Sequence, residues 1–335
     1  MKSAENELYN IKSLLFGLAV GDAVGVPFEF LSREEMELEP AEDMIGYGTY
    51  NQEAGTFSDD SSMSFALVEA LIDGYDLNLI GKNFVKWFDE GYWTAHGYAF
   101  DIGNTTEIAI SKLRNRASGK SGANGESGKS GKSGESVESG GKDDDDNGNG
   151  SLMRIAPLVF FVKDKDINER FKIMKEVSSI THGHIRSIIA CFYYIEYLIQ
   201  VLDGKDKFLI YEDLKKTVPE FLLEIDVEPE EINMFNRLLE NNIYEYDEEE
   251  INSGGYVLST LEASVYCLLT TNTYKESVLK AVNLGNDTDT TATVTGAMTG
   301  LLYGYDNIPE KWIKTLAKSN EIADLANRYS ISLLD

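Results

Sequence analysis

The chain has 335 residues, 42% of them hydrophobic, and a formal net charge of −27 at pH 7. This length can bury a large core. The negative charge lacks the basic footprint that nucleic acid or an anionic membrane surface requires, so neither is an expected partner. Residues 224–250 hold eleven Asp/Glu and one Arg, and we interpret them as a solvated acidic face that aids solubility.

The chain begins with MKSAENELYN, which has no apolar signal-peptide region. The apolar run from Leu14 to Val26 is interrupted by Asp22 and is too short to cross a bilayer. Cys191 and Cys267 lie in apolar helical patterns, which favours two buried thiols over a disulfide. We therefore expect a cytoplasmic protein, not bound to a membrane, and a monomer.

Apolar residues recur at helical spacing along most of the chain, whereas alternating strand patterns are scarce. The clearest predicted helices are a stripe from Met63 to Leu71 that stops at Gly74, and residues 184–202, 255–271 and 290–303. Residues 184–202 are apolar nearly all round, which predicts a central helix. The pattern favours an all-α bundle of ten or more helices, which we interpret as a single domain over residues 1–335.

Glycines recur every four residues in the apolar run near the N-terminus and in the segment that begins at residue 290. They are Gly17, Gly21 and Gly25, and Gly296, Gly300 and Gly304. Glycine inside a helix costs about 1 kcal/mol per position. A spacing of four puts the glycines on one face, where bare backbone permits close contact with another helix.

Residues 117–147 (ASGKSGANGESGKSGKSGESVESGGKDDDDN) form a low-complexity insert with a net charge of −3. Only Ala117, Ala123 and Val137 are apolar, so the segment offers little to offset the entropy of ordering. We predict a disordered loop. The run Asp143–Asp146 is expected to be a solvated charge block rather than a cation site.

Two acidic motifs, SDDS at residues 58–61 and DTDT at residues 287–290, each open an apolar helical pattern. Each pairs carboxylates with hydroxyls, and such oxygen ligands suit Mg²⁺ or Mn²⁺. If the fold brings the motifs together, four carboxylates converge and need neutralisation. This predicts a centre of two divalent metal ions. For either motif alone, ordinary helix N-capping remains the alternative.

Six short motifs occur in a fixed order along the chain. They are GLAVGDA (17–23), VPFE (26–29), GTFSDDS (55–61), GNGSLMR (148–154), THGH (181–184) and LGNDTDT (284–290). Together they closely resemble the ADP-ribosylglycohydrolase family, over essentially the whole chain except residues 117–147. The family usually has Thr where this chain has Ser58 and Ser61, a change that keeps the hydroxyl.

The resemblance implies a compact orthogonal multi-helix bundle with a binuclear Mg²⁺ (or Mn²⁺) site. It implies a hydrolase that cleaves the ribosyl bond of ADP-ribosylated proteins or small acceptors and releases ADP-ribose. One alternative is a catalytically silent ADP-ribose binder or a crystallin-like structural relative, against which the intact carboxylates argue. Another is a metal-dependent phosphohydrolase. The acceptor, whether arginine, serine or another group, stays open.

The resemblance also assigns roles to residues. The expected metal ligands are Ser58, Asp59, Asp60, Asp287, Asp289 and Thr290. The expected contacts to ADP-ribose are Asp101, Gly148, Asn149, Gly150, Ser151, Met153 and His182. The catalytic candidates are Glu29, Asp60 and Asp287. A metal-bridging aspartate, Asp287 or Asp289, or else Glu29, would take the proton of the attacking water.

Simpler interpretations of several residues stay open at this point. Glu29 could be a surface acid at a helix end, and His182 could be a packed histidine. Asn149 and Ser151, each next to glycine, could form a plain turn, and Arg154 could pair with an internal acid.

Overall fold

The computed structural model describes residues 2–117 and 137–334. Within these two segments the chain forms α-helices and short 3₁₀-helices, with three isolated β-bridges and no strand. The predicted all-α fold is confirmed, and the described residues contain seventeen α-helices.

The helices follow one another along the whole chain. They are α1 (Lys2–Gly25), α2 (Arg33–Leu38), α3 (Asp59–Ile72), α4 (Leu77–Glu90), α5 (Asn104–Ala117), α6 (Leu152–Ile155), α7 (Val159–Val162), α8 (Ile167–Ser179), α9 (Ile185–Leu202), α10 (Lys207–Glu224), α11 (Pro229–Asn233), α12 (Asn236–Leu239), α13 (Val257–Thr270), α14 (Tyr274–Asn283), α15 (Thr288–Tyr303), α16 (Glu310–Thr315) and α17 (Ser319–Ser332). The short 3₁₀-helices include η1 (Val26–Phe28), directly after α1, and η3 (Asp144–Asp146).

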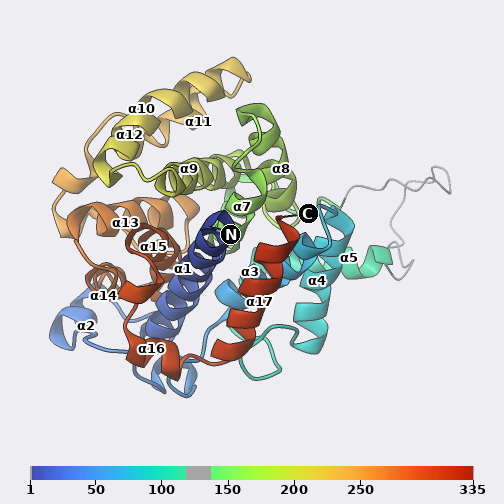
Figure 1. Ribbon diagram of the computed structural model, residues 1–335. Coiled ribbons are helices and arrows are strands. Elements are labelled where there is room, and N and C mark those ends of the chain that lie inside the picture. Colours follow the sequence, from blue (N-terminus) through green and yellow to red (C-terminus); the bar gives the residue numbers. More distant parts are fainter. Residues whose placement is uncertain (1, 118–136, 335) are drawn as a thin grey trace.

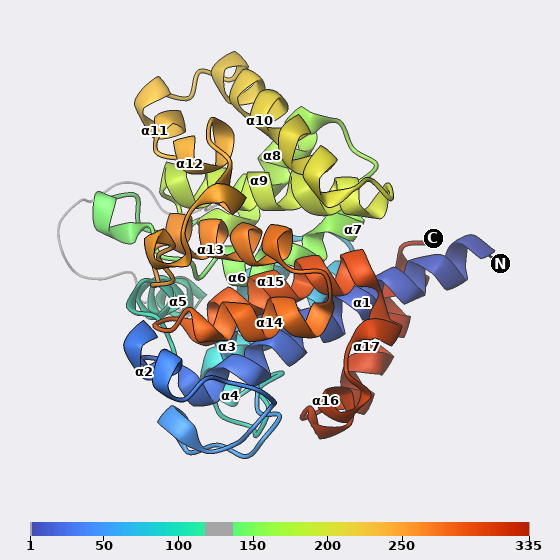
Figure 2. The same ribbon diagram turned by 90° about the vertical axis from the view of Figure 1, so that its left-hand side faces the viewer.

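Helices α1 and α15 cross the middle of the molecule, and the others pack around them (Figure 1). Helices α3, α4 and α5 lie on one side, and α13 and α14 on the other. Helices α8 to α12 form the upper part in both views (Figure 2). The buried hydrophobic side chains of all these parts belong to one core cluster.

Glycine sets the distance between α1 and α15. A Cβ atom at Gly17 would overlap the carbonyl oxygen of Gly296, and one at Gly21 would overlap that of Ala292. A Cβ at Gly25 would overlap the backbone of Asp289. The predicted close helix contact is therefore present. Gly304 has a different role, because it ends α15 with a φ of 88°.

The helices α1 and α9 owe their apolar composition to the core. Segments Ala4–Phe28 and Ile185–Leu202 are long and apolar enough to cross a membrane on length and composition alone. Their apolar windows are 94% and 78% buried inside the protein. Burial against other helices thus accounts for the predicted central helix at residues 184–202.

The predicted disordered insert is wrong at its C-terminal end, residues 137–147. The backbone N–H groups of Ser139 and Gly140 donate to the carbonyl of Ser179 at 3.2 and 3.1 Å. That of Gly183 donates to the carbonyl of Gly141 at 3.0 Å. These bonds to the chain between α8 and α9 order a segment that has few apolar side chains. Residues 118–136 lie outside the described residues.

The substitution Gly21→Ala should lower the melting temperature, because its Cβ has to displace the backbone of α15. Overpacking of this kind costs about 1–3 kcal/mol. Gly254→Ala is the matched control, since nothing lies within 4 Å of a Cβ at that position and its φ is not positive. Differential scanning calorimetry of both variants checks this, and equal melting temperatures would contradict the proposed contact.

Candidate functional site

The first acidic motif forms the N-terminus of α3. Ser58 is the N-cap, and its hydroxyl oxygen accepts from the N–H of Asp60 at 3.3 Å. The same hydroxyl lies 3.2 Å from Oδ2 of Asp60. Ser58 thus has the capping role that the sequence left open. Asp59 and Asp60 follow in the first turn, and both are buried.

A buried carboxylate on α1 holds this motif in place. Asp22 accepts from the N–H of Ser58 at 2.9 Å, the N–H of Ser61 at 3.0 Å and the Ser61 hydroxyl at 2.6 Å. Burial, the largest cause, raises its pKa to about 7. In the sequence, Asp22 appears as a break in an apolar run and as part of the GLAVGDA motif, and neither feature predicted this role. The available signal was an acid that falls within an otherwise apolar helix.

The second acidic motif begins α15. Asp287 is the N-cap, and its own N–H donates to the carbonyl of Ser253 at 2.9 Å. Its Oδ2 accepts from the side-chain amide of Asn149 at 2.8 Å. The Thr290 hydroxyl lies 3.4 Å from Oδ2 of Asp60. The two motifs, 230 positions apart, therefore meet in the fold.

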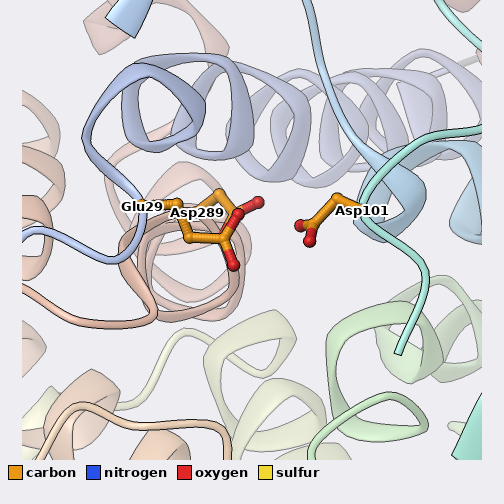
Figure 3. A group of neighbouring side chains, drawn as sticks. All are labelled: Glu29, Asp101 and Asp289. Atoms are coloured by element: carbon orange, nitrogen blue, oxygen red, sulfur yellow. The ribbon is translucent and has the colours of Figure 1, made fainter. Parts of the chain in front are cut away.

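Three carboxylates from distant parts of the chain form an acidic group. One oxygen from each of Glu29, Asp101 and Asp289 lies within 4.8 Å of the others. Asp101 faces the other two across a gap (Figure 3). The Tyr50 hydroxyl donates to Oδ1 of Asp101. Asp101 was predicted as an ADP-ribose contact, and its place in this acidic group was not foreseen.

Several buried carboxylate oxygens at these positions have no hydrogen-bond partner among the described residues. They are Oε2 of Glu29, Oδ1 of Asp60, Oδ1 of Asp287 and Oδ2 of Asp289. An ionised carboxylate without a partner is costly to bury. The negative charge of these carboxylates can be neutralised by a proton or by a cation. A ligand set made only of oxygen atoms fits a hard divalent cation.

The pKa values of these carboxyls also show that their ionised forms are unfavourable in the buried site. Burial, followed by the charge of Asp101, raises the pKa of Glu29 to about 10. Burial also raises the pKa values of Asp59, Asp60 and Asp289 well above the usual range. Each carboxyl is shifted first by loss of solvent and then by its acidic neighbours. A bound cation would offset both causes, because its charge favours the ionised carboxylates.

The acidic residues open onto a cleft of about 360 Å³. Its lining residues are Glu29, Phe30, Asp59, Asp60, Asp101, Ile102, Gly103, Asn104, Thr105, Thr106, Gly148, Asn149, Gly150, Met153, His182, Gly255, Asp287 and Thr290. The cleft thus brings together most of the residues predicted for metal and for ADP-ribose. The predicted residues outside this lining are Ser58, Ser151 and Asp289.

The loop that precedes α6 is tied to both sides of the cleft. The N–H of Asn149 donates to the carbonyl of Gly255 at 3.1 Å, and its carbonyl accepts from the N–H of Met153 at 3.0 Å. Its side chain reaches Asp287. Asn149 therefore links the glycine-rich loop to the acidic motif, which a plain turn would not do.

His182 is both packed and part of the cleft lining. Only 2% of it is exposed, and its Nδ1 lies 2.8 Å from the Thr181 hydroxyl. Burial and then the charge of Arg154 lower its pKa to about 3. The imidazole is therefore neutral at physiological pH. A Cβ at Gly150 would crowd the His182 ring, so the glycine permits this close approach.

Two predicted features of this loop need correction. Ser151 has no exposed surface, and its hydroxyl accepts from that of Ser178 at 2.9 Å. Ser151 therefore packs behind the loop, bonded to Ser178, and does not line the cleft. In the described part of the chain, the buried Arg154 guanidinium forms no salt bridge, and it donates to the carbonyls of Gly150 and Val177.

Phe30, which lines the cleft, and its neighbour Tyr50 were not predicted from the sequence. Phe30 lines the cleft beside Glu29 and has a φ of 66°. The Tyr50 ring centroid lies 6.3 Å from that of Phe30. Neither carries a sequence signal, because an aromatic residue in a short loop has the same pattern whether its side chain packs inward or faces a cleft.

Comparison with known proteins agrees with this geometry. The family model described as ADP-ribosylglycohydrolase matches residues 4–334. The chain belongs to the ADP-ribosylglycohydrolase family. The resemblance read from the six motifs is confirmed, and so is the prediction of a glycohydrolase at the level of the family.

Relatives in this family extend over most of the chain. The ADP-ribosylarginine hydrolase Tri1 of Serratia proteamaculans is 31% identical over 95% of this chain and 78% of its own length. The ADP-ribosyl-[dinitrogen reductase] glycohydrolase of Rhodospirillum rubrum is 23% identical over 90% of this chain and 87% of its own.

The fold matches a solved structure described as an ADP-ribosylglycohydrolase-related protein complex. The TM-score is 0.76 at 25% sequence identity, with 98% of this chain and 99% of the other covered. The ADP-ribosylglycohydrolase fold class predicted from the sequence is thereby confirmed.

Metal-free protein should lose stability as the pH rises. Raised pKa values mean that the folded state binds protons more tightly than the unfolded state, so unfolding free energy falls with pH. The window runs from 3.8 to about 7 for Asp22 and from 4.5 to about 10 for Glu29. Mg²⁺ or Mn²⁺ should reduce this slope, because a cation favours the ionised carboxylates.

Melting temperatures with EDTA and with Mg²⁺, at about pH 6 and pH 9, check this expectation. The stabilisation by metal should be larger at the higher pH. A stabilisation that is equal at both pH values would contradict the compensation of these carboxylates by metal.

Proposed function

We propose that this protein is a divalent-metal-dependent hydrolase that removes ADP-ribose from an arginine side chain of a modified protein. The observation that carries the proposal is the convergence at one cleft of buried carboxylates, several of which keep one oxygen without a hydrogen-bond partner among the described residues. Relatives from Serratia proteamaculans and Pseudomonas putida, both named ADP-ribosylarginine hydrolase Tri1, support arginine as the acceptor. Two free, buried cysteines support a reducing, cytoplasmic location.

We infer that two Mg²⁺ or Mn²⁺ ions occupy the acidic site. The residues that would hold them are Asp59, Asp60, Asp287, Asp289 and Thr290, with Glu29 as an additional carboxylate that the fold supplies. When bound, such ions neutralise the carboxylates, orient ribose hydroxyls and lower the pKa of a water. Ser58 would then act mainly by capping α3 beside Asp60.

The carboxylates suit cleavage of a ribosyl bond. The transition state carries positive charge on the ribose ring, and the surrounding acids stabilise such charge. Glu29, Asp60 and Asp287 each line the cleft and each keep one oxygen without a partner among the described residues. These three are therefore the candidates for the group that takes the proton of the attacking water.

The remaining cleft residues suit the ADP portion. The loop Gly148–Gly150 and the start of α5, at Asn104–Thr106, line the same cleft. A helix start and a glycine-rich loop expose backbone N–H groups, which suit a diphosphate. His182 is neutral there, so it can contribute a hydrogen bond but no charge.

A panel of ADP-ribosylated substrates with arginine, serine and small acceptors, assayed with Mg²⁺ and with EDTA, tests the function. Free ADP-ribose should appear from the arginine-linked substrate only when the metal is present. Release of inorganic phosphate instead would support a phosphohydrolase. Binding of ADP-ribose without any turnover would support a silent relative. Full turnover in excess EDTA would refute the metal centre.

The variants Asp60→Asn and Asp289→Asn should each lose at least about a hundredfold in kcat, the scale of lost electrostatic or metal catalysis. Both should stay folded, because a neutral isostere relieves repulsion between carboxylates in metal-free protein. Asp324→Asn is the control, since this exposed acid lies outside the cleft lining and pairs with Arg328 on its own helix. Wild-type rates in both site variants would rule out the assignment.

A further inference from the structure

Phe30 is an aromatic side chain that the fold holds out of the core. It is 69% exposed and lines the cleft beside Glu29. Its φ of 66° is rare for a residue with a bulky side chain. Both exposing the ring and holding this backbone conformation oppose folding, and such strain tends to lie at functional sites.

Backbone bonds fix this conformation. The N–H of Phe30 donates to the carbonyl of Asn286 at 2.7 Å, and the N–H of Asn286 donates to the carbonyl of Leu31 at 2.6 Å. The Thr49 hydroxyl donates to the carbonyl of Glu29 at 2.6 Å. The loop that carries Phe30 is therefore held against the chain just before Asp287, and the ring is presented from a fixed position.

The neighbours of Phe30 include a second aromatic ring and, bonded to that ring's hydroxyl, a carboxylate. The Tyr50 ring centroid lies 6.3 Å from Phe30 and 5.1 Å from Phe100. The Tyr50 hydroxyl donates to Asp101, which lines the same cleft. An aromatic ring and an anchored carboxylate that line one cleft match a planar cation, which can stack on the first and donate to the second.

The position within the cleft indicates which part of the substrate meets Phe30. Glu29, the preceding residue, offers an oxygen within 4.8 Å of oxygens of Asp101 and Asp289. The proposed cleavage takes place at these carboxylates, and the acceptor nitrogen is bonded directly to the reacting ribose carbon. The adenine is separated from that carbon by a second ribose and a diphosphate. The group nearest Phe30 is thus the acceptor.

We propose that Phe30 is a specificity residue that stacks on the guanidinium of the arginyl acceptor while Asp101, held by Tyr50, accepts its hydrogen bonds. This assignment rests on the proposed function. Among the residues that line the cleft, His182 is the only basic one, and it is neutral. Asp101 is the carboxylate of this lining that lies outside the set proposed to hold the metal ions, so it can pair with a cationic acceptor.

The test compares Phe30→Ala, Phe30→Leu and Phe30→Tyr in the full chain with metal present. Steady-state kinetics use an arginine-linked ADP-ribosyl peptide, and calorimetry measures the Kd of free ADP-ribose. Ala and Leu should lower kcat/KM roughly three- to thirtyfold, the range of a cation–π contact. Tyr, which keeps the aromatic face, should restore most of it. The Kd of ADP-ribose should change less than about twofold, because that ligand lacks the guanidinium.

Leu209→Ala is the matched control, since Leu209 is 67% exposed on α10 and outside the cleft lining. A kcat/KM equal to that of the wild type in Phe30→Ala would overturn the role of Phe30 but leave the proposed function standing. A weaker Kd for ADP-ribose by the same factor would also overturn this role of Phe30, and would indicate stacking on adenine. A wild-type protein that cleaves other ADP-ribosyl bonds but not the arginine-linked one would overturn the arginine acceptor together with this assignment.

Discussion

The backbone-to-backbone contact between α1 and α15 is the constraint on which the site depends. Gly17 and Gly21 allow the two helices to touch without intervening side chains, and Gly25 brings the end of α1 against Asp289. The Thr288 hydroxyl donates to the carbonyl of Gly25 at 2.8 Å, which fixes the register of this contact. A side chain at any of these glycines would move the second acidic motif away from the first.

Helix α1 positions the acids on both sides of this contact. Its residue Asp22 holds the N-terminus of α3, where Asp59 and Asp60 begin the helix. The chain that leaves α1 carries Glu29 through η1 to a place beside Asp289. One helix therefore sets the distances among carboxylates that come from three separate regions. This arrangement explains why residues so distant in the chain share one cleft.

The accumulated negative charge works against folding and in favour of the proposed chemistry. Burial and mutual repulsion raise the pKa values of these carboxyls, because the ionised forms lose water and gain acidic neighbours. The same conditions favour divalent cations and a cationic transition state. At the edge of the cleft, the exposed ring of Phe30 and the carboxylate of Asp101 extend this preference to a cationic acceptor.

The helical periodicity, the glycine spacing and the paired acids were visible in the sequence, because each depends on residues a few positions apart. They predicted the all-α fold and the glycine-lined helix contact, and they identified residues 58–61 and 287–290 as two motifs that would form a metal centre if the fold brought them together. The tertiary structure alone placed Asp101 beside Glu29, buried Ser151, and ordered residues 137–147 against the α8–α9 connection. It alone turned Phe30 toward the cleft, since that orientation depends on backbone bonds to Asn286, which lies 256 positions further along the chain.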